Sequence, residues 1–215
     1  MNVLVDNADL ILRGFRTTLA LTALSGVLAL ALGTALAAIR VSPVAALRWF
    51  GTTYVTVVRN TPLVVLLIVF VFGLPELGFQ FSFFVRAVIG LTVYTAAFVC
   101  EVLRSGINAV QPGQAEAARA VGMTFGQTLR EIVLPQAFRT VVPPLGSVFI
   151  ALTKNTAIAE AFGVTEATYV MDSLIRDFPG ALYALFFGIA AGYIVIVLGI
   201  SAVFRAIERN VLVLR

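Results

Sequence analysis

Long apolar runs separated by short polar stretches dominate this chain. No charged residue occurs between Arg16 and Arg40, and another uncharged run extends from Phe178 to Phe204. A helix that crosses a membrane needs about 20 mainly apolar residues. Five such stretches lie at residues 17–39, 54–74, 85–103, 141–162 and 178–204. The pattern therefore predicts an all-α polytopic membrane protein with five transmembrane helices.

Two of the five stretches contain prolines. The second carries Arg-Asn-Thr-Pro at residues 59–62 near its start, and the fourth opens with Pro143 and Pro144. A proline leaves backbone carbonyls without their helical donors, and Asn or Thr side chains nearby can bond such carbonyls instead. We expect Asn60 and Thr61 to brace the second helix in this way, and contact with the substrate is the alternative.

The composition agrees with a membrane protein and excludes several other classes. Of the 215 residues, 60% are hydrophobic and only 12% are charged, and the mean hydropathy is +1.01. A soluble domain is about half apolar and roughly a quarter charged, so an ordinary cytosolic enzyme and a disordered chain are both excluded. Five spans use the whole length. The sequence therefore predicts a single transmembrane domain over residues 1–215, without a separate catalytic domain.

The residue types also limit the chemistry of the chain. There is no histidine, which excludes histidine proton relays and histidine-ligated metal sites. We therefore expect neither a metal site nor a catalytic site. Lys154 is the only lysine and follows Thr153 rather than glycine, so a phosphate-binding loop ending in Gly-Lys-Ser/Thr cannot be formed. We expect no cofactor on this chain, and any ATP has to be bound by a partner chain.

Charged residues are sorted between the two sides of the predicted bundle. Most of the 15 basic residues lie in the 40–59 connection, in segment 104–139 and in the tail after residue 204, whereas the 160–177 connection is mainly acidic. Loops rich in Lys and Arg face the cytoplasm. We therefore expect the N-terminus outside and the C-terminus in the cytoplasm. This asymmetry accounts for the isoelectric point of 9.7 without a nucleic-acid partner.

Segment 104–139 is the one connection that is longer than membrane insertion requires. Pro112 suits the first turn of a helix, and Gly122 is a natural residue to end the Ala-rich stretch that follows. Thr124 and Gln127 have the spacing of a capping box. We therefore predict two short cytoplasmic helices, at 112–121 and at 125–133, the second ending before Pro135. A re-entrant or interfacial amphipathic helix is the alternative interpretation.

The same segment resembles a motif of ABC importer permeases. Positions at fixed spacing fit the family pattern EAA-x3-G-x9-I-x-LP without a departure: Glu116, Ala117, Ala118, Gly122, Ile132, Leu134 and Pro135. The Arg-Asn-Thr-Pro-Leu run at 59–63 and the Leu-Pro-Gln-Ala run at 134–137 resemble, more narrowly, the polar amino-acid (histidine, glutamine and glutamate) subfamily. The resemblance covers roughly residues 10–210.

The resemblance implies a type I ABC importer permease fold, as the transmembrane subunit of an ATP-driven amino-acid importer in the bacterial plasma (inner) membrane. Two permeases, identical or sister chains, would pair in the lipid. Two ATP-binding cassette subunits would dock below them, and an external or periplasmic solute-binding protein would deliver the substrate. The 112–121 helix would be the coupling helix, with Glu116 as its polar anchor and Ala117, Ala118 and Gly122 as its contact surface. A favourable acid in a first helical turn explains Glu116 equally well, and both explanations can hold together.

Polar residues inside the spans mark a candidate pathway, because ionisable groups in a membrane are costly and usually functional or paired. These residues are Lys154, Asn155 and Thr156 in the fourth span and Glu101 in the third. The family commonly reads Lys-Asp-Thr-Ser where this chain reads Lys-Asn-Thr-Ala. An acid at that place attracts a cationic substrate and disfavours an anionic one, so Asn155 favours glutamate or aspartate, with neutral polar amino acids next. The alternative is that Lys154 pairs with Glu101 or bonds carbonyls between helices.

Two other functions compete with the importer subunit. A self-sufficient secondary amino-acid transporter predicts inverted repeats and more intramembrane charges, and the chain shows no repeat. A membrane enzyme is disfavoured because a catalytic constellation is hard to assemble without histidine and with one cysteine, Cys100, in an apolar run. The sequence therefore favours the importer subunit, which is not itself an enzyme.

Overall fold

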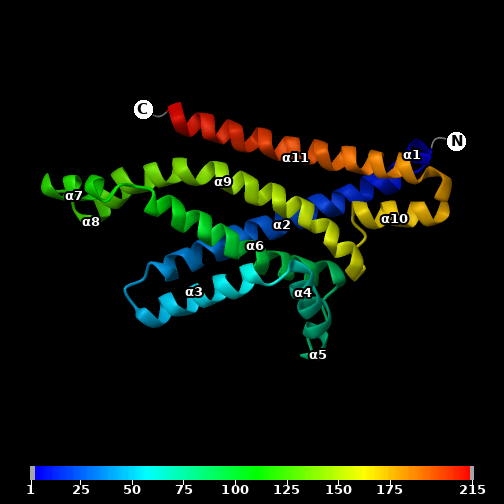
Figure 1. The fold of residues 1–215 in the computed structure, drawn as a ribbon, viewed down its shortest axis with the longest axis horizontal. Helices are drawn as coiled ribbons and strands as arrows, with labels where there is room; N and C mark the ends of the chain where they lie inside the picture. Colours follow the sequence, from blue (N-terminus) through cyan, green and yellow to red (C-terminus); the bar gives the residue numbers. More distant parts are fainter. Residues whose placement is uncertain (1–2, 214–215) are drawn as a thin grey trace.

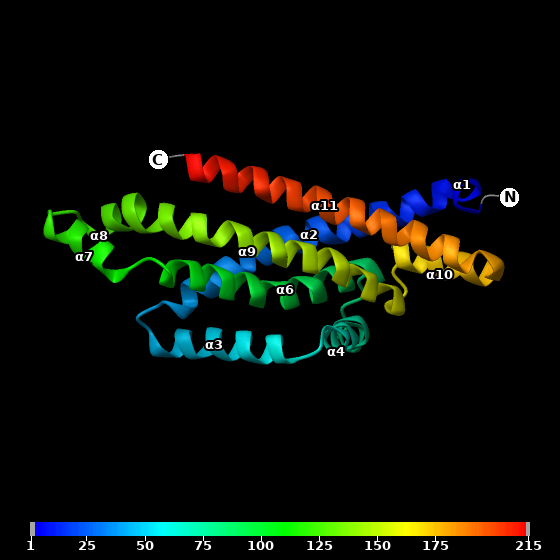
Figure 2. The same cartoon turned by 45° about the horizontal axis from the view of Figure 1, so that its top comes forward.

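The computed structural model describes residues 3–213, which fold into helices joined by short loops (Figure 1). Four long helices follow the long axis of the molecule: α2 (Ala8–Arg40), α6 (Phe83–Asn108), α9 (Leu134–Asn155) and α11 (Leu182–Val213). The short α1 (Val3–Asp6) and α10 (Ala167–Asp177) lie at one end, and α7 (Pro112–Ala120) lies at the other (Figure 2). The chain thus begins at one end of the bundle and finishes toward the other.

The predicted five-span architecture is confirmed, with one of the spans bent. Within residues 3–213, four helical segments are long and apolar enough to cross a membrane, and a bent helix pair supplies a fifth. The predicted spans at 17–39 and 85–103 lie within α2 and α6. The span predicted at 178–204 corresponds to α11, which is preceded by a 3₁₀ turn at Pro179–Ala181.

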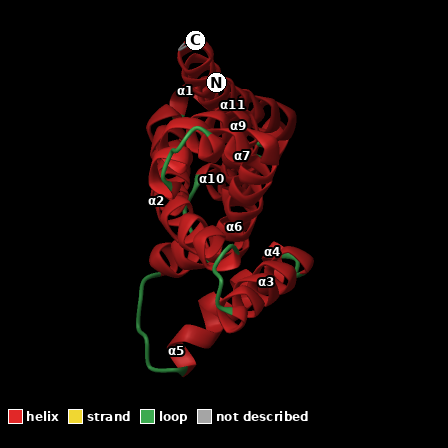
Figure 3. Cartoon of the chain, turned by 90° about the vertical axis from the view of Figure 1, so that its left-hand side faces the viewer, coloured by secondary structure: helices red, strands yellow, loops and turns green. Residues whose placement is uncertain are grey.

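The second span is not the continuous helix over 54–74 that the apolar pattern predicts. It consists of α3 (Ala45–Asn60) and α4 (Leu63–Ile68), followed by a π-helical turn (Val69–Gly73) and α5 (Leu74–Glu76), and it bends by 106° between α3 and α4. A proline drives the residue before it out of the helical region, and Thr61 accordingly has φ −97° and ψ 129°. Residues 59–61 therefore end α3 instead of beginning a span. Figure 3 shows α3, α4 and α5 on one side of the bundle of long helices, and α3 packs there against α2 and α6.

The fourth span begins earlier than predicted. Because α9 starts at Leu134, the Pro143–Pro144 pair lies inside this helix and does not open it. The short helix predicted at 125–133 does not end before Pro135 either. Instead, α8 (Phe125–Gln127) continues through a π-helical turn (Thr128–Val133) into α9. Interior prolines are tolerated in membrane helices that neighbouring helices support, and α9 packs against both α6 and α11.

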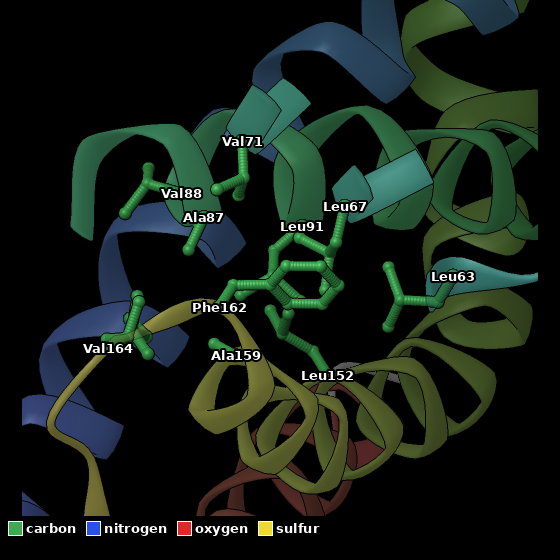
Figure 4. Packing of buried hydrophobic residues seen from close by; sticks show 11 residues of the cluster. Leu63, Leu67, Val71, Ala87, Val88, Leu91, Leu152, Ala159, Phe162 and Val164 are labelled. Atoms are coloured by element: carbon green, nitrogen blue, oxygen red, sulfur yellow. The ribbon is translucent and has the colours of Figure 1, made fainter. Parts of the chain in front are cut away.

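Small residues and a cluster of apolar side chains hold the bundle together. A Cβ atom at Gly33 of α2 would lie 2.6 Å from Cγ1 of Val99 and 2.9 Å from the carbonyl oxygen of Ala96, so α2 and α6 approach closely at this glycine. Under α4, Leu67 packs with Leu91 and Phe162 (Figure 4). The bent second span is therefore anchored on the long helices.

The acidic connection at 160–177 contains structure that the sequence analysis did not predict. A 3₁₀ stretch (Thr156–Phe162) is followed by α10, and the Glu166 side chain caps α10 by accepting a bond of 2.8 Å from the Tyr169 amide. Glu166 is fully buried, and its other carboxylate oxygen accepts hydrogen bonds from the Tyr193 hydroxyl at 2.6 Å and the Thr18 hydroxyl at 3.3 Å. This carboxylate therefore ties α10 to α11 and α2.

Candidate functional site

A groove with polar residues runs along α6, between α3 and α9. Three adjoining hollows of about 410, 280 and 340 Å³ form it, and Phe98 lines all three. The first two share Arg59 and Glu101, and the third ends at Asn155. We term this surface, lined by Arg59, Phe98, Glu101, Val148 and Asn155, the α6 groove. It places polar groups side by side in a chain that is otherwise strongly apolar.

Glu101 is the centre of a charged cluster at one end of the α6 groove. Its Oε2 atom lies 2.7 Å from Nη1 of Arg40 and 3.5 Å from Nη1 of Arg59, and its Oε1 atom lies 2.5 Å from Nη2 of Arg104. Three helices contribute to it: α2 and α3 supply one arginine each, and α6 supplies the carboxylate and Arg104. The cluster therefore combines one negative group with three positive groups.

Arg59 occupies the last turn of α3, where two hydrogen bonds fix the backbone beside it. Nδ2 of Asn60 donates to the carbonyl of Thr56 at 2.7 Å, and the Thr61 hydroxyl donates to the carbonyl of Val57 at 2.8 Å. The bracing expected of Asn60 and Thr61 is thereby confirmed, although it acts at the end of α3. The Arg59 guanidinium lies 5.5 Å from the centre of the Phe98 ring, a distance at which a cation is attracted to an aromatic face.

The predicted run at 154–156 lies where α9 passes into the 3₁₀ stretch. Asn155 lines the α6 groove, Lys154 is exposed, and the buried Thr156 hydroxyl donates to the carbonyl of Thr153 at 2.7 Å. Asn155 shares its hollow with Tyr94, which precedes Glu101 by about two helical turns, or roughly 10 Å. The alternative that Lys154 pairs with Glu101 is therefore wrong, because three arginines occupy that carboxylate. Glu101 and Asn155 belong to one groove, whereas Thr156 supports the backbone.

The second candidate site is the turn at the far end of the bundle, where α7 ends. Gly122 has φ +88°, and its amide and that of Met123 donate to the carbonyls of Arg119 and Ala118 at 3.0 and 3.1 Å. These two bonds form the Schellman motif that commonly ends helices. The predicted capping box follows at once, since the Thr124 amide donates to Oε1 of Gln127 at 2.9 Å.

The predicted docking residues differ in exposure. Glu116, Ala117 and Gly122 face outward, and Val121 is 79% exposed. Ala118 is only 6% exposed, because α7 packs against the π-helical turn Thr128–Val133. The outward face of α7 therefore comprises Glu116, Ala117, Val121 and Gly122, while Ala118 is a packing residue within the chain.

Sequence reasoning missed the arginines that contact Glu101, and it missed Phe98. One signal was available. A single carboxylate in an apolar span needs a cationic partner, and Arg40, Arg59 and Arg104 all flank predicted spans on the side where Glu101 lies. Which arginines reach it depends on how α2, α3 and α6 are aligned, and composition does not contain that information.

Comparison with known proteins extends over most of the chain. Residues 28–213 match the family described as binding-protein-dependent transport system inner membrane component. The chain is 43% identical over 205 residues to the glutamate transport system permease protein GluC of Corynebacterium glutamicum, covering 90% of each protein. It is 36% identical over 214 residues to the probable glutamine ABC transporter permease protein GlnM of Bacillus subtilis, covering 98% of this chain and 97% of the relative.

A solved structure is also similar. The crystal structure of an amino acid ABC transporter with histidines aligns with a TM-score of 0.89 at 33% identity, covering 96% of both chains. Since this likeness includes nearly every described helix, it confirms the predicted all-α permease fold.

Proposed function

This chain belongs to the family of binding-protein-dependent transport system inner membrane components, and we propose that its α6 groove forms one half of a path for an acidic amino acid. As a member of that family, the chain is a permease subunit of an amino-acid ABC importer in the bacterial inner membrane, and it is not an enzyme. The observation that carries the proposal is the groove itself, a line of polar residues between three apolar helices.

The size and exposure of the groove support a path that needs a second subunit. Two of its hollows, of about 410 and 340 Å³, fall within the roughly 300–1,000 Å³ typical of small-molecule sites. The Arg59 side chain is 43% exposed at the rim of the groove. A second permease, identical or a sister chain, would close the groove within the lipid.

The charge of the groove supports an acidic substrate, glutamate or aspartate. Three arginines surround Glu101, so this end of the groove has an excess of positive charge that attracts a carboxylate. The other end carries the neutral Asn155. The relative named for glutamate transport agrees with this choice, and the relative named for glutamine makes a neutral polar amino acid the alternative.

The outward face of α7 supports a coupling role. A nine-residue helix with small side chains, ended by a Schellman motif, is a short rigid body that a partner can approach closely. ATP-binding cassette subunits would seat this helix, with Glu116 as polar anchor and Ala117, Val121 and Gly122 in contact. ATP would stay on those subunits, and their closure would move α7 and the attached spans together.

This role of α7 also sets the orientation. The end of the bundle with α7 and α8 would lie in the cytoplasm, as would the C-terminus, and the N-terminus and α10 would lie outside. The solute-binding protein would then dock at the end that carries α10. The basic residues of segment 104–139 support this placement, because loops rich in Lys and Arg face the cytoplasm.

Reconstitution tests the function. The chain would be placed in proteoliposomes with its ATP-binding cassette subunits, its partner permease and its binding protein, and labelled glutamate uptake would be measured with and without ATP. We expect uptake only with ATP and the ATPase. Uptake driven by an ion gradient in the absence of the ATPase would instead establish a secondary transporter.

A further inference from the structure

The helix α11 is the most exposed of the long helices and forms one edge of the molecule (Figure 1). Only 11% of its most apolar stretch is buried, compared with at least 33% in the other three long spans. Near its C-terminal end, Phe204 packs against α9. A Cβ atom at Gly146 would lie 3.1 Å from Cβ of Phe204, and the rings of Phe204 and Phe149 are 5.5 Å apart. The opposite face of these last turns is therefore turned away from the bundle.

This outward face contains a basic hollow of about 370 Å³. Two alanines, two arginines and an asparagine line it: Ala202, Arg205, Ala206, Arg209 and Asn210. The alanines and the arginines are exposed, and each pair has the spacing of four residues that places it on one helix face. Ala202 is two residues from Phe204, or about 200° around the helix. We term this surface the α11 hollow, in which the small alanines leave room beside the guanidinium groups.

The two arginines of the α11 hollow have no acidic partner among the residues that the structure describes. Neither Arg205 nor Arg209 forms a salt bridge there, and Nε of Arg205 donates to the Ser201 carbonyl of its own helix at 3.3 Å. The nearest acid in the sequence, Glu208, is half-buried. It follows Ala202 by six residues, which places it about a third of a turn away from the centre of the hollow. The hollow therefore has two positive charges that no described carboxylate neutralises.

The length of α11 places the hollow at the depth of the lipid headgroups. Its 32 residues extend over about 48 Å, whereas the hydrocarbon core of a bilayer is about 30 Å thick and needs about 20 residues. A span that begins at Leu182 ends near Ala202, and the uncharged run ends at Phe204. Toward the middle of the membrane, the same face continues with Val195 and Leu198, which are 68% and 57% exposed. A basic hollow is thus followed by an apolar surface that suits acyl chains.

We propose that the α11 hollow binds the headgroup of an anionic phospholipid, with Arg205 and Arg209 on its phosphate and the acyl chains along Val195 and Leu198. The planar guanidinium group fits phosphate oxygens with two parallel hydrogen bonds. A zwitterionic headgroup also carries an ammonium group, which two unneutralised arginines repel. Basic residues directly beyond the apolar part of a membrane helix attract anionic lipid. This inference goes beyond the proposed function and does not depend on it, because it involves neither the substrate nor the ATPase.

The position of the α6 groove favours lipid over a second permease as the occupant. On α9, the groove is lined by Ser147, Val148 and Ala151, and a second permease would close it on that side. The contacts of α9 with Phe204 of α11 involve Gly146 and Phe149. Ser147 and Ala151 are each two residues from Phe149, so they lie on nearly the opposite side of α9. A permease over the groove therefore leaves the outward face of α11 to lipid.

Native mass spectrometry of the purified importer complex tests this site. The complex is titrated with phosphatidylglycerol or with phosphatidylethanolamine of the same acyl chains, and we expect the wild type to bind phosphatidylglycerol more tightly. Arg205→Gln combined with Arg209→Gln should weaken one phosphatidylglycerol site per copy of this chain about 30-fold, since each basic residue near anionic lipid contributes a factor of about five. Both side chains are exposed, so the fold should be retained.

A second variant separates the hollow from its charge. Ala206→Leu keeps both arginines but fills the space beside them, and we expect it to weaken phosphatidylglycerol binding about as much as the loss of one arginine. The control combines Arg48→Gln with Arg130→Gln, which removes the same charge from the same end of the bundle (Figure 1). Arg48 bonds the carbonyls of Ser42 and Pro43, and the Arg130 side chain is 86% exposed. This control should keep the wild-type affinity.

Four results would overturn the inference. Three of them are an unchanged phosphatidylglycerol affinity in the double arginine variant, an equal loss in the control, and equal binding of the two lipids by the wild type. The fourth is displacement of phosphatidylglycerol by millimolar inorganic phosphate, which would establish a site for a free anion instead. Lipid binding is measured without transport, so absence of ATP-dependent uptake by the wild type would refute the proposed function alone.

Discussion

Replacing Gly122 with valine should uncouple transport from ATP hydrolysis without disturbing membrane insertion. Gly122 has φ +88°, a left-handed conformation that costs an L-residue with a side chain about 1–2 kcal/mol, and a β-branched residue lies at the upper end. About 2 kcal/mol lowers the ratio of formed to unformed turn roughly 30-fold. A Cβ atom at this position would meet nothing within 4 Å, so the cost falls on the turn after α7 and not on the packing of the spans.

The assay measures ATP hydrolysis and glutamate uptake together in the reconstituted complex. Gly122→Val should lose stimulation of hydrolysis by the loaded binding protein, while the amount of chain in the membrane stays normal. Gly122→Asn should retain more coupling, because asparagine tolerates the left-handed region. Gly126→Val is the control: Gly126 also has open space around its Cβ position, but its φ is not positive. Normal coupling in Gly122→Val would refute the role of this turn.

Three further changes follow from the packing and from the groove. Glu166→Ala removes the acceptor of the Tyr169 amide and leaves the half-buried Tyr193 hydroxyl with Thr168 alone. The thermal unfolding midpoint in detergent should therefore fall by an amount that reflects about 1–3 kcal/mol for the orphaned amide; an unshifted midpoint would contradict the tie between helices. Gly33→Leu overpacks the contact with Val99 and should cost about 1–3 kcal/mol in the same assay, whereas Gly199→Leu should not, because a Cβ atom added at Gly199 would meet no atom within 4 Å. Asn155→Asp should lower glutamate uptake relative to that of a cationic amino acid, and equal uptake ratios in variant and wild type would remove the charge argument at this position.

The features that the sequence predicts well are local. Apolar runs predict α2, α6 and α11 because a span depends on the apolarity of about 20 consecutive residues. The capping box depends on residues three positions apart, and Thr124 and Gln127 form it as expected. Gly122 ends α7 with a positive φ, again for a reason contained in one residue and its neighbours.

The features that the sequence predicts poorly depend on how distant segments align. Arg40 of α2 and Glu101 of α6 are 61 residues apart in the chain, yet Nη1 of Arg40 lies 2.7 Å from Oε2 of Glu101 in a salt bridge. The sequence allows Lys154 as a partner of Glu101 because both are charged residues inside predicted spans. Whether two such residues pair depends on their positions along the helix axes. For the same reason the sequence does not distinguish the two neighbouring alanines of α7. Ala117 is exposed, whereas Ala118 is buried against the rest of the chain.

The bend at Pro62 explains how the chain keeps Arg59 at a groove in an otherwise apolar region. Beyond the bend, Leu63 and Leu67 of α4 are buried in a cluster with Leu91 of α6. Pro62 forbids the regular helical bonds at the corner, and the leucines hold the segment beyond it against the bundle. The last turn of α3 is therefore fixed at the rim of the α6 groove, where its arginine extends toward Phe98 and Glu101 rather than into lipid.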